Sequence, residues 1–253
     1  MDTDRMEQLL RRLRLPRIRL IVGEWVARCS KDGTSLMDFL GGLLEEEIAS
    51  REESRLRTAM RRANFPFERT LDQFDFRRHP ELRRQVFQTY LDPSFVRDGR
   101  ALVLVGPPGL GKTHLAVAIG TYMIQRGFNV RCIRVSTLVN RMLACDGVRD
   151  RERFLNTYKR CDLLVLDELG YLLPEPETGP ILYELMADRY EKRATIITSN
   201  KTLTEWGKIV QDGALASALV DRLMHHGDVY YLKGQSYRLK DKKLAEGETR
   251  DAA

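Results

Sequence analysis

Gly106-Pro107-Pro108-Gly109-Leu110-Gly111-Lys112-Thr113 is the stretch of sequence that decides the fold. It follows the apolar run Leu102–Val105 and precedes an amphipathic stretch that begins at His114. A glycine-rich loop in this setting lets several backbone N–H groups point at one anion, and the amino end of the next helix adds its positive dipole. We therefore expect all eight residues to bind phosphate, with Lys112 on the β- and γ-phosphates and Thr113 as a Mg²⁺ ligand.

Two adjacent carboxylates follow another apolar run. Asp167 and Glu168 come directly after Leu163–Leu166. A buried strand delivers its last residues to the sheet edge where the phosphate loop lies, so Asp167 is expected to hold Mg²⁺. Glu168 is placed to orient or deprotonate the attacking water. An acidic pair can also simply start a helix, but the upstream loop favours the metal site. No Asn/Thr-Lys-x-Asp guanine motif is present, which favours ATP over GTP.

The pattern of apolar residues along the chain changes at residue 101. Short apolar runs alternate with helical stretches from there on, which is typical of a parallel sheet covered by helices on both faces. The runs are Ala101–Val105, Val130–Val135, Leu163–Leu166, Thr195–Thr198 and Val229–Leu232. We expect an α/β core over residues 101–243, a linker and adenine-side segment over 65–100, a small all-helical domain over 1–64 and a flexible tail over 244–253.

Residues 1–64 show helical spacing of apolar side chains on both sides of Pro16. Ser30–Gly33 is expected to form a turn, and Thr34 or Ser35 to cap a third helix that carries apolar side chains at Leu36, Phe39, Leu40, Leu43, Leu44 and Ile48. We expect these stripes to bury one another for the most part, with a partner-binding role for part of the surface as the alternative. Thr70–Phe76 alternates apolar and polar residues and is expected to be extended, before a helix over roughly Pro80–Leu91.

Three further polar residues have two interpretations each. Asn200 follows the run Ala194–Ser199 and either positions the attacking water and senses the γ-phosphate or is a turn residue. Arg222 is either a surface cation near a helix end or a finger that reaches a neighbouring subunit's γ-phosphate. Arg238 is either a surface residue or a nucleotide sensor. Spacing alone does not decide between the two interpretations of Arg222 or of Arg238.

Composition limits the class of protein and its expected location. The chain has 253 residues, with 42 Lys+Arg against 36 Asp+Glu and a formal net charge of +6. No apolar run approaches the roughly 18–20 residues of a membrane span, and no secretory leader is evident, so a cytoplasmic protein is expected. Four cysteines are present, at Cys29, Cys132, Cys145 and Cys161, without the spacing of a zinc site or disulfide framework. His114, His225 and His226 also lack metal-ligand spacing and are interpreted as packing or hydrogen-bonding residues.

Several motifs together resemble those of AAA+ ATPases of the DnaA/DnaC/IstB clade, and within it the IstB-like transposition helper ATPases of insertion sequences. The phosphate loop continues into Lys112-Thr113-His114-Leu115, a mark of the clade. The closer matches are Asp167-Glu168-Leu169-Gly170-Tyr171-Leu172, Thr198-Ser199-Asn200, Leu219-Val220-Asp221-Arg222-Leu223-Met224-His225-His226 and Ser236-Tyr237-Arg238-Leu239. The resemblance covers residues 5–243.

This resemblance implies a P-loop AAA+ core with a parallel five-stranded sheet, ATP hydrolysis with Mg²⁺, and a role for each candidate residue. Lys112 and Thr113 belong to the first (Walker A) motif and Asp167 and Glu168 to the second (Walker B). Asn200 resembles the first sensor, Arg222 the finger acting in trans and Arg238 the second sensor. It further implies ATP-dependent oligomers on duplex DNA, largely independent of DNA sequence, that bend the DNA and stimulate a partner transposase near the bacterial nucleoid.

The basic residues of the chain are candidate contacts to DNA. A net charge of +6 becomes substantial when several protomers line one duplex, and such binding is mostly to phosphates. The candidates are Arg131, Arg134, Arg149, Arg151, Arg153, Lys159 and Arg160. Each could instead pair with a nearby acid, and the stretch Cys145–Arg153 is short where relatives often carry a longer basic insertion. A helicase loader of the DnaC type is the alternative function, and an ATP-bound switch with negligible turnover is a third.

Overall fold

The computed structural model describes residues 3–80, 82–171 and 176–234. The chain divides into two compact units, Met1–Thr58 and Ala59–Ala253. Helix α3 (Leu36–Ala63) begins in the first unit and ends in the second. Within the described residues, no helix combines the length and apolar character needed to cross a bilayer.

The first unit is helical, as predicted. It contains α1 (Thr3–Arg12), α2 (Pro16–Asp32) and most of α3, around a small core of Leu10, Ile18, Ile21 and Leu43. Leu15, at the N-cap of α2, has no side-chain oxygen to offer the free N–H groups of the first turn. The buried Glu47 of α3 accepts them instead, from Arg17 N at 2.9 Å and Ile18 N at 3.1 Å. This long-range cap fixes α2 against α3.

One local prediction for the first unit is wrong and another is confirmed. Ser30, Lys31 and Asp32 are helical, because α2 continues to Gly33, which caps it in the left-handed conformation at φ 62°. Ser35 does cap α3, since its Oγ accepts a hydrogen bond from Asp38 N at 3.1 Å.

A row of apolar side chains on α3 is exposed rather than buried, which corrects the expectation of a mostly self-burying stripe. Leu36 is 86% exposed, Leu40 51%, Leu44 44% and Ile48 56%. Leu43 and Glu47, on the same helix, are only 4% and 3% exposed. The small core of this unit therefore covers those two residues and leaves the row uncovered.

The second unit is built on a parallel sheet. Its strands are β1 (Ala101–Val105), β2 (Val130–Arg134), β3 (Leu163–Leu169), β4 (Ala194–Ser199) and β5 (Gly227–Tyr231). Over the described residues the sheet is five-stranded, in the order β2-β3-β4-β1-β5, and all pairings are parallel. The α/β class and all five predicted strands are confirmed, with bounds that move by a few residues.

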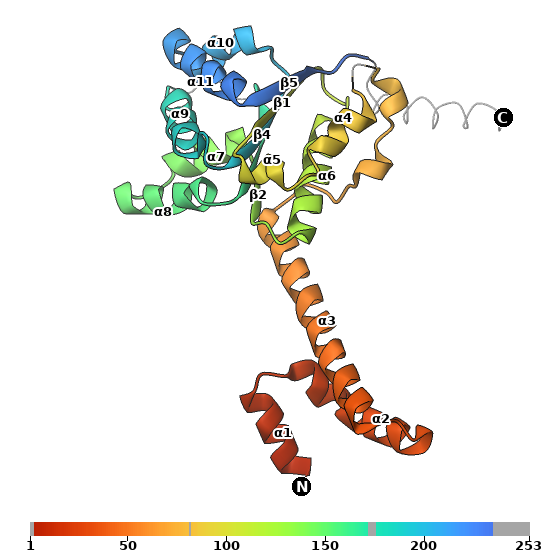
Figure 1. The fold of residues 1–253 in the computed structure, drawn as a ribbon. Coiled ribbons are helices and arrows are strands. Elements are labelled where there is room, and N and C mark those ends of the chain that lie inside the picture. Colours follow the sequence, from red (N-terminus) through yellow and green to blue (C-terminus); the bar gives the residue numbers. More distant parts are fainter. Residues whose placement is uncertain (1–2, 81, 172–175, 235–253) are drawn as a thin grey trace, which may run out of the picture. The chain divides into compact units, whose positions relative to one another are not determined.

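Both faces of the sheet are covered by helices (Figure 1). Val103 and Ile197 point to one face and their neighbours Leu102 and Ile196 to the other, which explains why the strands are continuously apolar. The first face packs on α7 (Val135–Leu143), α8 (Val148–Lys159), α9 (Thr178–Arg189), α10 (Trp206–Val210) and α11 (Gly213–His225). The second packs on α6 (Lys112–Gln125), α4 (Arg84–Thr89) and α5 (Ser94–Arg97).

The segment before the sheet differs from its prediction. Residues 70–76 are not extended but contain the 3₁₀ turns η1 (Leu71–Gln73) and η2 (Phe76–Arg78). A capping box between Thr70 and Gln73 closes the first turn and places Leu71 and Phe74 on one buried side. The helix expected over Pro80–Leu91 is limited to α4, because Arg83 is extended at φ −77° and ψ 124°.

Candidate functional site

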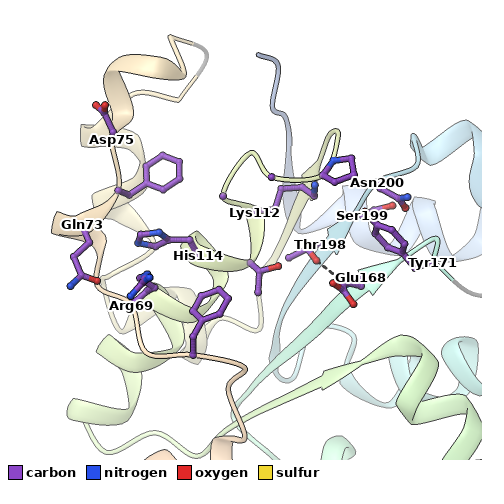
Figure 2. Close-up of a pocket in the computed structure, with 16 residues that line it drawn as sticks. Arg69, Gln73, Asp75, Lys112, His114, Glu168, Tyr171, Thr198, Ser199 and Asn200 are labelled. Carbon is purple, nitrogen blue, oxygen red and sulfur yellow. Dashed lines mark hydrogen bonds between the residues drawn. The ribbon is translucent and has the colours of Figure 1, made fainter. Parts of the chain in front are cut away.

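A cavity of about 540 Å³ lies at the carboxyl edge of the sheet. Three segments meet there, namely the loop after β1, the ends of β3 and β4, and the segment from Phe67 to Asp75 (Figure 2). The lining residues are Phe67, Arg69, Gln73, Phe74, Asp75, Pro108, Gly109, Gly111, Lys112, Thr113, His114, Glu168, Tyr171, Thr198, Ser199 and Asn200. Most of the sequence-predicted site residues thus converge on one cavity.

The loop from Gly106 to Thr113 has the backbone that its glycines predict. Gly109 and Gly111 adopt φ 80° and 84°, and a Cβ on Gly111 would lie 2.6 Å from Phe74 Cε2. A residue with a Cβ would be strained at these positive φ angles, and at Gly111 it would also clash with Phe74. Glycine therefore fits both positions, where other residues would not. Helix α6 starts at Lys112, whose Nζ donates to Gly106 O at 2.6 Å and Pro107 O at 2.7 Å. The ammonium group is therefore held within the arc of the loop.

Asp167 joins the loop to two strands. Its side chain is buried, with the residue 2% exposed, and Oδ1 accepts hydrogen bonds from Thr113 Oγ1 at 2.8 Å and Thr198 Oγ1 at 2.6 Å. Thr198 Oγ1 in turn accepts from Glu168 N at 2.9 Å, as Figure 2 shows. Sequence reasoning placed Thr198 at the end of an apolar run but missed this bridging role. A polar residue inside an apolar strand was the available signal.

Glu168 lies at an irregularity in the sheet. The β3–β4 register shifts between Leu166 and Leu169, and Glu168 has φ 61°, a strained angle for a side chain with a Cβ. Its Oε2 forms an ion pair with Arg134 Nε at 3.2 Å. Arg134 stands opposite Asp167 on the neighbouring strand β2, so the register places it one residue from Glu168, at the irregularity. Sequence reasoning gave Arg134 as a DNA contact or as the partner of a nearby acid, without identifying Glu168 as that acid.

Asn200 follows β4 at the same edge. Its Oδ1 is buried and accepts no hydrogen bond from the described residues. The side chain packs so closely on Gly170 that a Cβ there would lie 2.3 Å from Oδ1. A buried acceptor in a polar cavity is one that a ligand or a water molecule can satisfy. Asn200 thus lines the cavity with a free acceptor in the described structure.

The opposite wall of the cavity is aromatic. The rings of Phe74 and His114 meet edge to face at 5.4 Å, and His114 Nε2 lies 2.9 Å from Thr70 O. Burial lowers the pKa of His114, which favours the neutral ring. The prediction that His114 is a packing and hydrogen-bonding residue is confirmed. A wall of this kind can pack against a planar base, while the phosphate loop lies across from it.

Of the two predicted arginines, one lies outside the lining of the cavity and the other outside the described residues. Arg222, on α11, is absent from the lining of the cavity; its guanidinium stacks 4.4 Å from the Tyr183 ring centroid. Its Nη1 is buried without a hydrogen-bond partner among the described residues. Arg238, with the motif around it, lies outside the described residues, as do Leu172 and the tail from 244 on.

The candidate DNA contacts fall into two groups. Arg131 donates from Nη1 to Arg62 O at 2.7 Å, Arg134 pairs with Glu168, and Lys159 forms ion pairs with Glu184 at 2.7 Å and with Asp188. The second group has exposed side chains that form no ion pair within the described part of the chain. It comprises Arg149, Arg151, Arg153 and Arg160 on and after α8.

The residues present fit a magnesium nucleotide. Thr113 and Asp167 offer a hydroxyl and a carboxylate 2.8 Å apart, which are the hard oxygen donors that Mg²⁺ prefers. The cavity is within the range of small-molecule sites, roughly 300–1,000 Å³. Together with the strand order, the loop and the paired acids define a P-loop protein with an AAA+ core.

Family comparison gives the same class and narrows it. Residues 8–245 match the model of the IstB-like ATP-binding proteins, so the chain belongs to this family. It is 36% identical over 251 residues to an ATP-binding protein of insertion sequence IS5376 from Geobacillus stearothermophilus, which covers 98% of this chain and 99% of the relative. It is 34% identical to an ATP-binding protein of insertion sequence IS21 from Pseudomonas aeruginosa, covering 95% and 91%.

Solved structures share the fold at lower identity. The DnaC helicase loader matches with a TM-score of 0.52 and 23% identity, covering 68% of this chain and 97% of that one. AMPPCP-bound DnaA from Aquifex aeolicus matches with a TM-score of 0.57 and 23% identity, covering 72% and 56%. These likenesses confirm the AAA+ fold.

The bridging role of Thr198 can be tested by substitution. We predict that Thr198→Val lowers the free energy of unfolding by about 1–3 kcal/mol, because the buried Asp167 and the half-buried N–H of Glu168 both lose a partner. Thr198→Ser keeps the hydroxyl and serves as the control, with a smaller loss. Urea unfolding of the three proteins measures this. Equal stability of the valine and serine variants would contradict the bridge.

Proposed function

We propose that this protein hydrolyses ATP and assembles as an oligomer on duplex DNA, where it serves a partner transposase in the transposition of an insertion sequence. The observation that carries the proposal is the chain of hydrogen bonds from Thr113 through Asp167 to Thr198, which joins the phosphate loop to β3 and β4. Membership in the IstB-like family, and relatives named after insertion sequences, support the transposition role.

The proposed nucleotide site assigns each residue a physical task. The N–H groups of residues 106–113 and the amino end of α6 hold the phosphates, and Lys112 adds a charge-assisted hydrogen bond. Thr113 and Asp167 hold Mg²⁺ between them. The bound ion would neutralise charge on the phosphate oxygens. Phe74 and its neighbours form the side of the cavity where the base fits.

Glu168 is the proposed acceptor of the water proton. It lies beside Asp167 on the lining of the cavity, and the ion pair with Arg134 orients its carboxylate. Asn200 offers a buried amide oxygen at the same edge, suited to hold the attacking water against the γ-phosphate. The strained φ of Glu168 is consistent with a backbone built to aim this side chain.

Arg222 is proposed to act on a neighbouring subunit. Its guanidinium lies outside the chain's own cavity and stacks on Tyr183, with one nitrogen unpartnered in the described structure. A finger of this kind completes the site only after assembly, which would make turnover depend on oligomerisation. Arg238 is proposed as the second sensor on the basis of the family resemblance.

Exposed side chains mark the surfaces proposed to bind DNA and the partner protein. Arg149, Arg153 and Arg160 lie on or directly after one helix with exposed side chains, and assembly would align several copies of this basic set along a duplex. The exposed row Leu36, Leu40, Leu44 and Ile48 in the first unit is suited to a contact with the transposase or another protomer. The proposal places the protein in the bacterial cytoplasm, with the DNA.

A helicase loader has the same core, so the likeness to DnaC does not separate the two functions. The insertion-sequence relatives, at 34–36% identity over nearly the whole chain, favour transposition. Co-purification with a transposase rather than with a replicative helicase would distinguish them. Phosphate release with and without DNA would distinguish both from an ATP-bound switch.

Two variants separate ATP binding from hydrolysis. We predict that Lys112→Ala weakens ATP binding about 100-fold, since the charge-assisted hydrogen bonds of the ammonium are lost. Glu168→Gln should bind ATP normally but release phosphate about 10²–10⁴-fold more slowly. Fluorescent-nucleotide titration and a phosphate-release assay measure the two quantities. Tight binding by the alanine variant or normal turnover by the glutamine variant would overturn the respective role.

Mixing of subunits tests the action of Arg222 in trans. Arg222→Ala alone should lose turnover by about 10³–10⁵-fold. Added Glu168→Gln protein, which keeps Arg222 and binds ATP but turns over far more slowly, should restore phosphate release by the Arg222→Ala sites. Absence of rescue, under conditions where wild-type subunits mix, would rule out action across an interface.

Binding to duplex DNA tests the assembly. We predict tight binding with a non-hydrolysable ATP analogue and weaker binding with ADP or no nucleotide. A triple change of Arg149, Arg153 and Arg160 to Gln should weaken binding and flatten its salt dependence, since each lost phosphate contact removes about 0.9 from the log–log slope. Lys192→Gln, an exposed cation elsewhere, is the control. Equal binding in all nucleotide states would contradict an ATP-gated assembly.

A further inference from the structure

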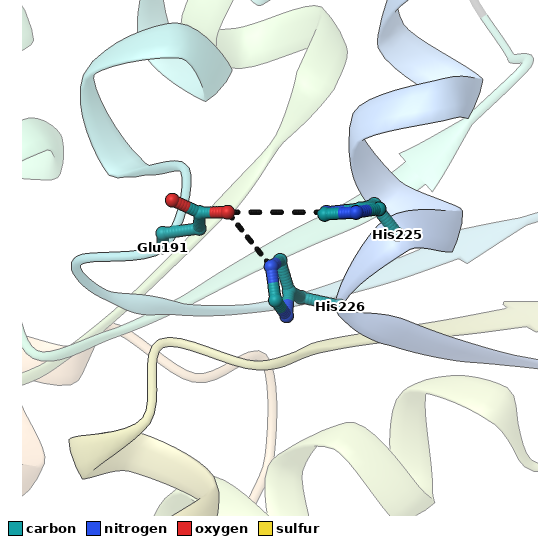
Figure 3. Close-up of side chains that lie close together, drawn as sticks. All are labelled: Glu191, His225 and His226. Carbon is teal, nitrogen blue, oxygen red and sulfur yellow. Dashed lines mark hydrogen bonds and ion pairs between the residues drawn. The ribbon is translucent and has the colours of Figure 1, made fainter.

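The side chains of Glu191, His225 and His226 meet in the structure (Figure 3). They precede β4 and β5, so they lie at the amino edge of the sheet, opposite the nucleotide cavity. Glu191 Oε1 lies 2.7 Å from His226 Nε2 and 3.8 Å from His225 Nδ1. One ligand atom from each residue lies within 4.8 Å of the others, and all three residues are exposed. Nothing in the proposed ATPase chemistry uses this cluster. Sequence spacing did not reveal it, because Glu191 is separated from His226 by 35 positions.

The backbone holds the three residues in place. Glu191 occupies the tight turn between α9 and β4 at φ 57°, where Lys192 N and Arg193 N both donate to Arg189 O at 3.0 Å. His225 is the last residue of α11, and His226 O accepts from Ala101 N at 3.1 Å at the start of β1. The cluster thus connects two turns that the sheet itself fixes. A small site of this kind is organised before any ligand binds.

Three arginines near the cluster are engaged elsewhere. The buried Arg189 donates to carbonyls of Tyr158, Cys161 and Ala194, and Arg193 pairs with Asp162 at 3.3 Å. Arg222 stacks on Tyr183. The negative end of the helix dipole, at the carboxyl end of α11, lies at the cluster and favours a bound cation.

We propose that Glu191, His225 and His226 form a binding site for Zn²⁺ or a similar transition-metal dication, with water completing the coordination. Two imidazoles and one carboxylate are a donor set typical of such metals and poorly suited to Mg²⁺. Ligand atoms of a tetrahedral zinc site lie about 3.4 Å apart, given metal–ligand distances of about 2.0–2.2 Å. Side-chain rotation would widen the 2.7 Å separation of Glu191 and His226 and shorten the 3.8 Å separation of Glu191 and His225 toward that value. The ion would replace the hydrogen bond between Glu191 and His226.

Tyr190 is the group that competes with the metal. Its hydroxyl lies 2.7 Å from His225 Nδ1, so binding through this nitrogen displaces the phenol. The metal would tie the turn after α9 to the end of α11, three residues beyond Arg222. The metal site itself is independent of the proposed function. If that function holds, the bound ion restrains the helix that carries the trans-acting arginine.

Zinc binding by the full chain without an affinity tag tests the proposal. Wild-type protein should bind one more equivalent of Zn²⁺ than His225→Gln/His226→Gln, measured by competition with a chromophoric chelator. Counting the difference excludes zinc held by the free thiols of Cys29 and Cys145. Glu191→Gln should weaken binding at least about tenfold, the smallest effect usual even for groups that only support a ligand. Equal zinc uptake by the wild type and the double variant would overturn the site.

Two matched variants and a thermal scan complete the experiment. His114→Gln removes a histidine outside the cluster and should leave zinc uptake unchanged. Tyr190→Phe removes the competing hydroxyl and should bind zinc at least as tightly as the wild type; a loss as large as that of the double variant would contradict the assigned ligands. Zn²⁺ should raise the melting temperature of the wild type but not of the double variant, whereas millimolar Mg²⁺ should raise neither through this cluster. Circular dichroism without metal confirms that the variants fold.

Discussion

The carboxylate of Asp167 is the point on which the architecture of the site depends. It is buried at the end of β3, and its Oδ1 takes hydroxyl hydrogen bonds from both Thr113 and Thr198. Without such donors, removing this carboxylate from water would cost a large free energy. The position of the phosphate loop relative to β3 and β4 is therefore coupled to one oxygen atom. Every role proposed for Lys112, Glu168 and Asn200 follows from that placement.

Much of the core could be predicted because its signals are local. The loop from Gly106 to Thr113 needs glycine angles, and the runs around Val103 and Ile197 need a sheet buried on both faces. Asp167 and Glu168 followed from their position after such a run. Residues 70–76 were predicted wrongly because alternation of apolar side chains over seven residues fits a pair of short turns as well as a strand. The capping box at Thr70 and Gln73 was the better signal.

What the sequence could not predict depends on contacts between distant segments. The Arg134–Glu168 pair arises from strand register, and Glu47 caps α2 from 30 positions away from Arg17. The cluster of Glu191, His225 and His226 arises because two turns meet at one edge of the sheet. The exposure of the apolar row on α3 depends on which face the other helices of the first unit cover. Spacing along the chain carries none of this information.

The most direct test of the account is a structure of the protein with Mg²⁺, a non-hydrolysable ATP analogue and duplex DNA. The account predicts phosphates on the N–H groups of residues 106–113, Mg²⁺ between Thr113 and Asp167, and Arg222 of a neighbouring protomer at the γ-phosphate. A nucleotide bound away from this loop, or protomers on DNA with Arg222 remote from every nucleotide, would contradict it.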